Sequence, residues 1–448
     1  MAVHVQAVRE QQGVPGRSTP GRLRQLLWLL LAGCLAWGAV AAVTADQHAS
    51  AASDVVAISE PLSLDAEQTY QNLSDADAVA ASAFLAGGLE PAAQRDRYNA
   101  DITAAGVKIE SASALVGGSA ARSGLPGALA SQAAGTGKAV GDDLAILTAE
   151  LPVYTGEVAT ARADNRVGLP LGAAYLREAD GLLRGELLIA ANDIYVRESA
   201  LLTSASAQAT GLPLLATALV LGLALCVAIV VTGRWLSRRT HRTLNTGLLG
   251  AFIVGVLALA WLAAAFGIGR SHLLSAQQHG SIPAQTYADA EVSALRAHTD
   301  EALTLINNAG DDSYEKDFAA QQQRLGRLLQ SLSTNGPAPS SIAGASALTP
   351  AMLDQEWTRA HHALRALDNG GNHAAAVQEA LTGQAAITFE RFSGSLTGGI
   401  TYSQATFADS ARKGRDAFTG LAIGMIVAAL LMAAACLWGL NRRLAEYR

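Results

Sequence analysis

The chain centres on LPLLATALVLGLALCVAIVVT (residues 212–232), GRWLSRRTHRTLNT (233–246) and GLLGAFIVGVLALAWLAAAFGIG (247–269). The first and third stretches contain no Asp, Glu, Lys or Arg. About 20 apolar helical residues cross a bilayer core of roughly 30 Å, and a helix satisfies every backbone group internally. We therefore predict two transmembrane helices, 212–232 and 247–269, joined by a short loop.

The loop between these two spans is basic. It carries Arg234, Arg238, Arg239 and Arg242 and no acidic residue. Short Arg-rich loops remain on the cytoplasmic side of a membrane. The loop 233–246 is therefore predicted to be cytoplasmic, and the chain on either side of this hairpin is predicted to lie outside the cytoplasm.

Two further apolar runs complete an arrangement of four spans. Residues 25–45 follow a basic tail, 1–24, and residues 417–440 precede a second basic tail, 441–448. We predict a multi-pass plasma-membrane protein with both termini cytoplasmic. The first run could also be a cleaved signal peptide, because Val43-Thr44-Ala45 offers small residues. It exceeds the usual signal core of about 7 to 15 residues, which favours an uncleaved anchor.

The remaining stretches, 46–211 and 270–416, are each long enough to be a domain. In the first, Leu73, Val79 and Phe84 belong to a set of apolar residues that recurs at helical spacing, and Gly-Gly pairs end the helical patterns in both stretches. The predicted fold is therefore all-α. It is a membrane protein with four transmembrane helices and two extracytoplasmic helical domains in tandem, each like a four-helix bundle.

Composition agrees with this fold class. Half of the residues (50%) are hydrophobic and 16% are charged, as suits a membrane protein with sizeable soluble parts. Cys34, Cys226 and Cys436 all lie in apolar runs, so neither a disulfide framework nor a cysteine metal site is expected.

The search for catalytic motifs is negative. The chain has no His-Glu-x-x-His, Cys-x-x-Cys, Gly-x-Ser-x-Gly or kinase signature. The sequence GTGK at 135–138 lacks the spacing of a phosphate loop and the Ser or Thr after the lysine. His361 and His362 would point about 100° apart on a helix, which disfavours shared metal ligation. We expect no enzymatic activity, no metal or cofactor, and no nucleic-acid partner.

The predicted spans also argue against transport. None contains an acidic residue, Lys, Arg or His, whereas transporters place polar or ionisable groups inside the membrane. Gly420 and Gly424 form a Gly-x-x-x-Gly pattern in the last span, which suits close helix packing either within the molecule or in a homodimer.

With catalysis and transport disfavoured, the remaining functions are sensing and bridging across the membrane. A helix that continues from an outer bundle through the bilayer can carry small displacements to the other side. The basic loop is the cytoplasmic element tied to both outer stretches, so we identify a candidate output surface at Arg234, Trp235, Arg238, Arg239 and Arg242. The alternative is that these arginines only maintain topology and contact anionic lipid headgroups.

The stretches TYQNLSDADAVAASAFLAGG (69–88), with Tyr98, and AYLREADGLL (174–183) resemble the four-helix-bundle sensor domains of chemoreceptor-type proteins. The four-span plan resembles the actinobacterial GlnX-type membrane protein. This resemblance implies amino-acid sensing and two partners, an extracytoplasmic solute-binding lipoprotein of the glutamine-binding type and a cytoplasmic Ser/Thr kinase of the protein kinase G type.

The leading hypothesis is therefore a non-catalytic membrane protein that relays the state of the binding protein to the kinase. A second hypothesis is a direct small-molecule sensor with its ligand in a bundle pocket, for which the clustered cations are Arg95, Arg97, Arg177 and Arg184. A third is a structural protein of the cell envelope.

Overall fold

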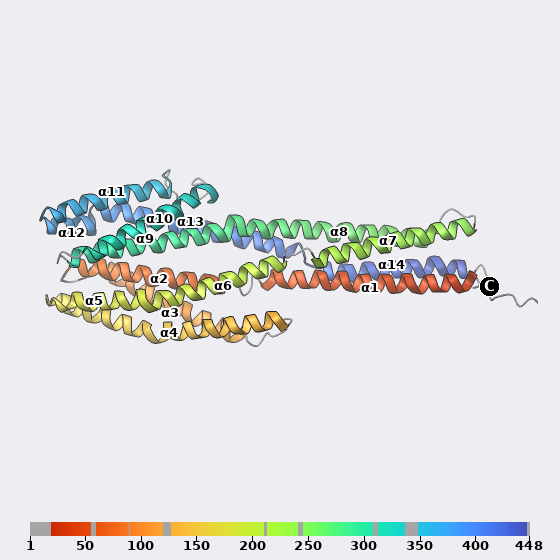
Figure 1. Cartoon of the computed structure of the whole chain (residues 1–448), viewed down its shortest axis with the longest axis horizontal. Helices are drawn as coiled ribbons and strands as arrows, with labels where there is room; N and C mark the ends of the chain where they lie inside the picture. The colour runs from red at the N-terminus through yellow and green to blue at the C-terminus, as the bar shows by residue number, and fades with distance from the viewer. Residues whose placement is uncertain are drawn as a thin grey trace, which may run out of the picture. The chain divides into compact units, whose positions relative to one another are not determined.

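The computed structural model describes residues 19–54, 60–88, 90–119, 127–209, 213–240, 245–307, 312–336 and 348–445. These residues are almost entirely helical and contain no strand, which confirms the predicted all-α class (Figure 1). Four helices are long and apolar enough to cross a membrane, within Arg24–Ser50, Leu214–Arg238, Thr246–Asn307 and His373–Arg442. Each of the four predicted spans overlaps one of these segments.

The helices follow one another along the described chain. In order they are α1 (Thr19–Asp54), α2 (Glu60–Leu85), α3 (Ala92–Ser119), α4 (Gly127–Arg166), α5 (Leu171–Leu182), η2 (Leu183–Leu187), α6 (Leu188–Ala209), α7 (Pro213–Thr240), α8 (Thr246–Ala276), η3 (Gln277–Ser281), α9 (Ile282–Asn307), α10 (Ser313–Asn335), α11 (Pro350–Asn369), α12 (His373–Thr382), α13 (Gln384–Asp416) and α14 (Leu421–Ala445). The elements η2 and η3 are single π-helical turns inside longer helices. The path from α8 through η3 to α9 is thus one unbroken helix.

The chain packs as two compact units. The first, which we call the span unit, comprises residues up to 50, 209–270 and 415 onward. The second, the bundle unit, comprises residues 51–208 and 271–414.

Small residues bring the helices of the span unit close together. A side chain at Gly38 of α1 would overlap Ala429 of α14, and one at Gly222 of α7 would overlap Trp37 of α1. Trp37 also donates its indole N–H to the carbonyl of Ala218, at 3.0 Å. Since apolar side chains gain nothing by leaving lipid, close packing of this kind is what holds helices together in a membrane.

Among the described residues, the bundle unit has two large hydrophobic cores, one built mainly from each of the stretches 46–211 and 270–416, and a smaller cluster around Leu305 and Leu364. The first gathers side chains of α2 to α6, with Tyr154 and Leu183 fully buried, and it includes Leu303 from α9. The second is built around Trp357 of α11 and Phe392 of α13. Ala78 of α2 belongs to this second core. Each of these two cores therefore includes a residue from the other stretch.

The helices α2 and α9 join the two stretches. α2 packs against both α3 and α9, and α9 packs in turn against α10 (Figure 1). α2 buries several alanines, among them Ala78 in the core shared with α9, and short side chains let neighbouring helix axes approach closely. The structure places both stretches in one compact unit, and their division into two bundles in tandem stays a prediction.

Candidate ligand pocket and buried ionic network

A polar cavity lies in the bundle unit where the stretches 46–211 and 270–416 meet. Its volume is about 120 Å³, and its walls come from α2, α3, α9, α12 and α13. The lining residues are Asp75, Ala78, Val79, Ser82, Gln94, Arg97, His298, Ala380, Leu381, Ala386, Phe389 and Glu390. The pocket thus combines side chains that are far apart in the sequence.

Arg97 ties the walls of this cavity together. Its Nε and Nη2 donate to the two oxygens of Asp75 at 3.0 and 2.9 Å, and its Nη1 donates to Glu390 Oε1 at 3.1 Å. Burial lowers the pKa of Arg97, but the two carboxylates outweigh burial and hold the pKa above its usual value. Burial, together with the Asp75 carboxylate, raises the pKa of the neighbouring Asp101 to about 8.

His298 forms another wall of the cavity. Its Nε2 lies 3.3 Å from the Ser82 hydroxyl, and its ring stacks on Phe389 with the centroids 4.0 Å apart. Its Nδ1 is 3.5 Å from Glu301 Oε1, which is too long for a strong hydrogen bond. His298 therefore connects the cavity to a carboxylate deeper in the unit.

Behind the cavity, one guanidinium faces several buried acids. Arg184, in the π-helical turn η2, lies 2.6 Å from Asp180 Oδ1 and 2.8 Å from Asp300 Oδ1. Burial and then the Asp180 carboxylate raise the pKa of Asp77 well above its usual range, and Tyr154 donates its hydroxyl to Asp77 at 3.4 Å. Burial raises the pKa of Asp300 to about 7, although Arg184 opposes the rise. One cation cannot neutralise three carboxylates, so this network retains a proton near neutral pH.

A second buried ion pair involves Glu301, the next residue of α9. His361 has no exposed surface, and its Nδ1 lies 2.7 Å from Glu301 Oε2 while its Nε2 lies 3.3 Å from Glu315 Oε1. Burial lowers the pKa of His361, but the hydrogen bonds to Glu301 and Glu315 outweigh burial and raise the pKa to about 9. Burial raises the pKa of Glu301, but its contacts with the two histidines prevail and lower the pKa to about 2. Both partners are therefore charged at neutral pH.

Asp300 and Glu301 are neighbours on α9, and they pair with residues from different stretches of the chain. Asp300 pairs with Arg184 of the first stretch, whereas Glu301 pairs with His361 of the second. A rotation or shift of α9 would change both buried pairs at once. Single π-turns, such as the one that holds Arg184, also occur frequently at functional sites.

The contact between α2 and α9 carries two more buried acids. Burial, with the charges of Asp289 and Glu291, raises the pKa of Glu67 to about 8. Burial raises the pKa of Glu291 to about 7, although a hydrogen bond from Thr397 at 2.7 Å opposes the rise. These carboxyls gain charge above neutral pH and then repel one another across the contact of α2 with α9, which we call the joint between the two stretches.

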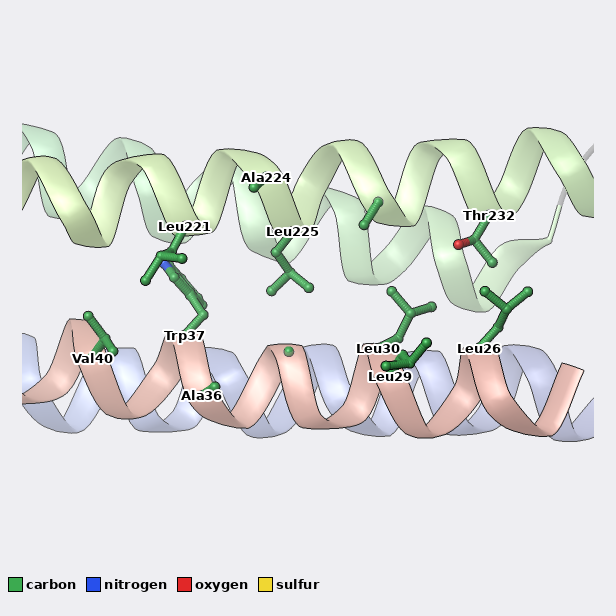
Figure 2. Close-up of a pocket in the computed structure, with 12 residues that line it drawn as sticks. Leu26, Leu29, Leu30, Ala36, Trp37, Val40, Leu221, Ala224, Leu225 and Thr232 are labelled. Atoms are coloured by element: carbon green, nitrogen blue, oxygen red, sulfur yellow. The ribbon is translucent and has the colours of Figure 1, made fainter. Parts of the chain in front are cut away.

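A larger cavity of about 410 Å³ belongs to the span unit and has a different character. It lies between α1 and α7, and Leu26, Leu30 and Trp37 face Leu221 and Leu225 across it (Figure 2). Its walls are almost wholly apolar, with Thr232 as a polar exception. Such a groove offers no charged group for recognising a polar signal.

The four clustered arginines have separate partners. Arg97 lines the polar cavity and Arg184 lies in the buried network. Arg95 lies 3.8 Å from Glu90, and Arg177 donates to Asn307 at 2.9 Å. They do not form one cationic site, because each has its own hydrogen-bond or ion-pair partner.

The residues of the candidate output surface lie at and beyond the end of α7. Arg234 and Arg238 are exposed, and their spacing of four residues puts them on one face of the helix. Trp235 lies between them and is partly buried. Arg239 belongs to α7, with its side chain outside the described part of the structure, and Arg242 lies outside the described residues.

The two glycines of the Gly-x-x-x-Gly pattern have different roles. A side chain at Gly424 would overlap the Trp261 ring of α8, so this glycine permits close helix packing within the span unit. Gly420 instead lies in the turn between α13 and α14 with φ of 75°, and a Cβ there would meet open space. Its left-handed backbone, which glycine adopts without strain, explains why it stands there.

Sequence reasoning missed Asp77, Asp300, Glu301 and His361 as members of a network. The sequence carried a signal for Asp77, which interrupts the alanine-rich face of its helix, and the structure buries it with 5% exposed. Acids at core positions of an amphipathic helix require partners, but the sequence does not identify those partners. Arg184 is four residues from Asp180 and 116 residues from Asp300 along the chain, so only the fold reveals their shared contact.

Comparison with known proteins agrees with this picture. Residues 51–207 match the family model described as an actinobacterial sensor domain. No curated protein and no solved structure matches the chain. The match indicates an actinobacterial sensor protein, and hence a role in sensing or signalling. It covers α2 to α6, which contribute Arg97 and Arg184 to the sites described above.

Proposed function

We propose that the protein is a non-catalytic transmembrane sensor that relays the state of its bundle unit to the cytoplasm. In this proposal the bundle unit lies outside the cell, the four apolar helices cross the membrane, and both termini and the loop 233–246 are cytoplasmic. The Arg distribution supports this orientation through the tendency of basic loops to stay inside. The sensor-domain match supports the sensing role.

One observation carries the proposal. The helix that begins at Thr246 runs unbroken to Asn307, and near its far end Asp300 and Glu301 enter buried ion pairs with Arg184 and His361. A change in either pair biases the position of a helix whose first residues directly follow the basic loop. A rigid helix can carry such a displacement over its length.

We further propose the two partners that the GlnX-type resemblance implies. A solute-binding lipoprotein would dock on the bundle unit outside, and a Ser/Thr kinase would read the candidate output surface inside. The exposed arginines Arg234 and Arg238 offer donors to acidic side chains of such an effector. The signal reported in this way would be the availability of an amino acid.

Co-purification from the native membrane tests this proposal. Recovery of a binding protein and a kinase with the wild-type chain supports it, whereas recovery of neither would favour a structural role in the envelope. The variant Arg238→Lys/Arg239→Lys keeps the charge but loses the planar fork that binds carboxylates. We expect it to insert normally and to lose the effector; unchanged effector recovery would count against the output surface.

The polar cavity favours a second candidate function, direct sensing of a small molecule. Its walls come from both outer stretches, so a ligand would bear directly on the joint between them. The two functions differ in the component that binds the signal. Binding of a metabolite by the purified chain alone would support direct sensing.

A further inference from the structure

We propose that the cavity around Arg97 binds a small organic cation with a primary ammonium group. This inference rests on the proposed sensing role and names a ligand class for it.

The cavity has room for a small molecule. Its volume of about 120 Å³ is several times the roughly 10–15 Å³ needed for one water. A molecule with a few heavy atoms therefore fits, while a peptide or a sugar chain does not. Access is from solvent, because the side chain of Glu390 is 64% exposed.

The charges in the wall favour a cation. Asp75 and Glu390 provide two carboxylates against the single guanidinium of Arg97. The charge of Arg97 is already matched, because both carboxylates accept hydrogen bonds from it. An added anion would meet a net negative wall, whereas an added cation would meet an excess of acceptors.

The hydrogen-bonding groups point to the same class. A carboxylate has about four acceptor sites, and Glu390 uses one oxygen for Arg97. Gln94 also lines the cavity, and its Oε1 is buried without a hydrogen-bond partner among the described residues. An ammonium group has three donors and no acceptor, so it can engage Glu390, Asp75 and Gln94 together.

Binding here would act on the joint between the two stretches. Asp75 and Gln94 belong to the first stretch, while Glu390 and His298 belong to the second. A bound cation would hold α13 towards α2 and α3, and so stabilise the contact between the two stretches. The ligand would thereby stabilise one arrangement of the bundle unit, as a sensor requires.

Calorimetric titration of the purified full-length protein in detergent tests the inference, with propylamine and propionate as probes of matched size. We expect propylamine to bind, with an affinity that falls as salt rises, and propionate not to bind. Equal binding of the two probes, binding of propionate alone, or binding of neither would overturn the inference.

Two substitutions sharpen the test. Glu390→Gln should weaken propylamine binding by about tenfold, the scale of one lost hydrogen bond to a charged group. Glu356→Gln is the matched control, because Glu356 also pairs with an arginine, Arg391, but does not line the cavity. Ala386→Leu should block binding by filling the space. Propylamine binding that survives both cavity variants would refute the site.

The outcome can be separated from that of the proposed relay. The titration uses purified protein and depends neither on orientation in the membrane nor on an effector. A negative titration with intact kinase co-purification would reject the ligand class and leave the relay standing. A positive titration without an effector would reject the relay alone.

Discussion

The pair of His361 and Glu301 offers a sharp test of the buried network. His361→Leu would leave Glu301, which is 1% exposed, without its hydrogen bond to His361 and with His298 Nδ1 at 3.5 Å. Breaking a buried pair by removing one partner costs about 3–5 kcal/mol. We expect a loss of that size in the free energy of unfolding near neutral pH.

The pH dependence fixes the sign of the effect. The pKa of His361 rises from 6.5 to about 9 on folding, which corresponds to about 3 kcal/mol of stability while the ring is charged. This contribution is fully present below pH 6.5 and is lost as the pH rises through about 9. The contribution of Glu301 is fully present above pH 4.5 and is lost as the pH falls towards about 2. Both arise from one pair, so they are not added together.

The assay is thermal unfolding of the purified protein, followed by far-ultraviolet circular dichroism at about pH 6 and about pH 10. The gap between wild type and His361→Leu should narrow by about 3 kcal/mol at the higher pH. The double variant His361→Leu/Glu301→Met should recover most of the loss at the lower pH, because no unpaired charge remains. A gap below about 1 kcal/mol at the lower pH, or the same gap at both pH values, would refute the ion pair.

Three further outcomes are expected. Asp77→Asn should raise the free energy of unfolding above neutral pH, because the raised pKa of Asp77 means that the folded state resists its ionisation. Thermal unfolding at two pH values would measure this gain, and its absence would contradict the burial of Asp77. Gly424→Leu should lower the melting temperature through its overlap with the neighbouring helix, and an unchanged value would count against that contact. Single cysteines at the exposed Thr160 and Thr334 should react with an impermeant thiol reagent in intact cells, while one at Ser237 should not, because Ser237 is proposed to face the cytoplasm. The native cysteines are buried and should not add to the signal. Labelling at Ser237 would overturn the proposed orientation.

Much of the fold could be predicted from the sequence. Long uncharged runs such as 247–269 have few alternatives to a membrane helix, because backbone polar groups must be satisfied in hydrocarbon. The sequence also indicates a helix that leaves this span, although Gly280 and Pro283 lie in its path, and the structure continues it to Asn307 through the π-helical turn η3. Local rules of this kind need no knowledge of the tertiary structure.

The joint between the two stretches, where α2 packs against α9, could not be predicted in the same way. Ala78 belongs to the second core and Leu303 to the first, and no local pattern marks either residue for exchange. The cavity depends on this joint, because Arg97 meets Glu390 across nearly 300 residues of chain. The sequence identified Arg97 as a clustered cation, but its partners come from the packing of α2 and α13.

Gly420 shows a different kind of limit. Its spacing from Gly424 is typical of helix packing, yet a helix boundary falls immediately after it. The pattern has the same letters in either role, and the backbone conformation decides between them.

Hydrogen exchange in the basic loop 233–246 shows whether a change in the bundle unit reaches the predicted cytoplasmic side. The measurement compares wild type and Asp300→Asn, both full-length in lipid nanodiscs, with Glu356→Gln as a control outside the network. Asp300→Asn weakens the contact of α9 with Arg184, so the account predicts altered exchange in α9 and also in the loop. Altered exchange in α9 with an unchanged loop would contradict the relay.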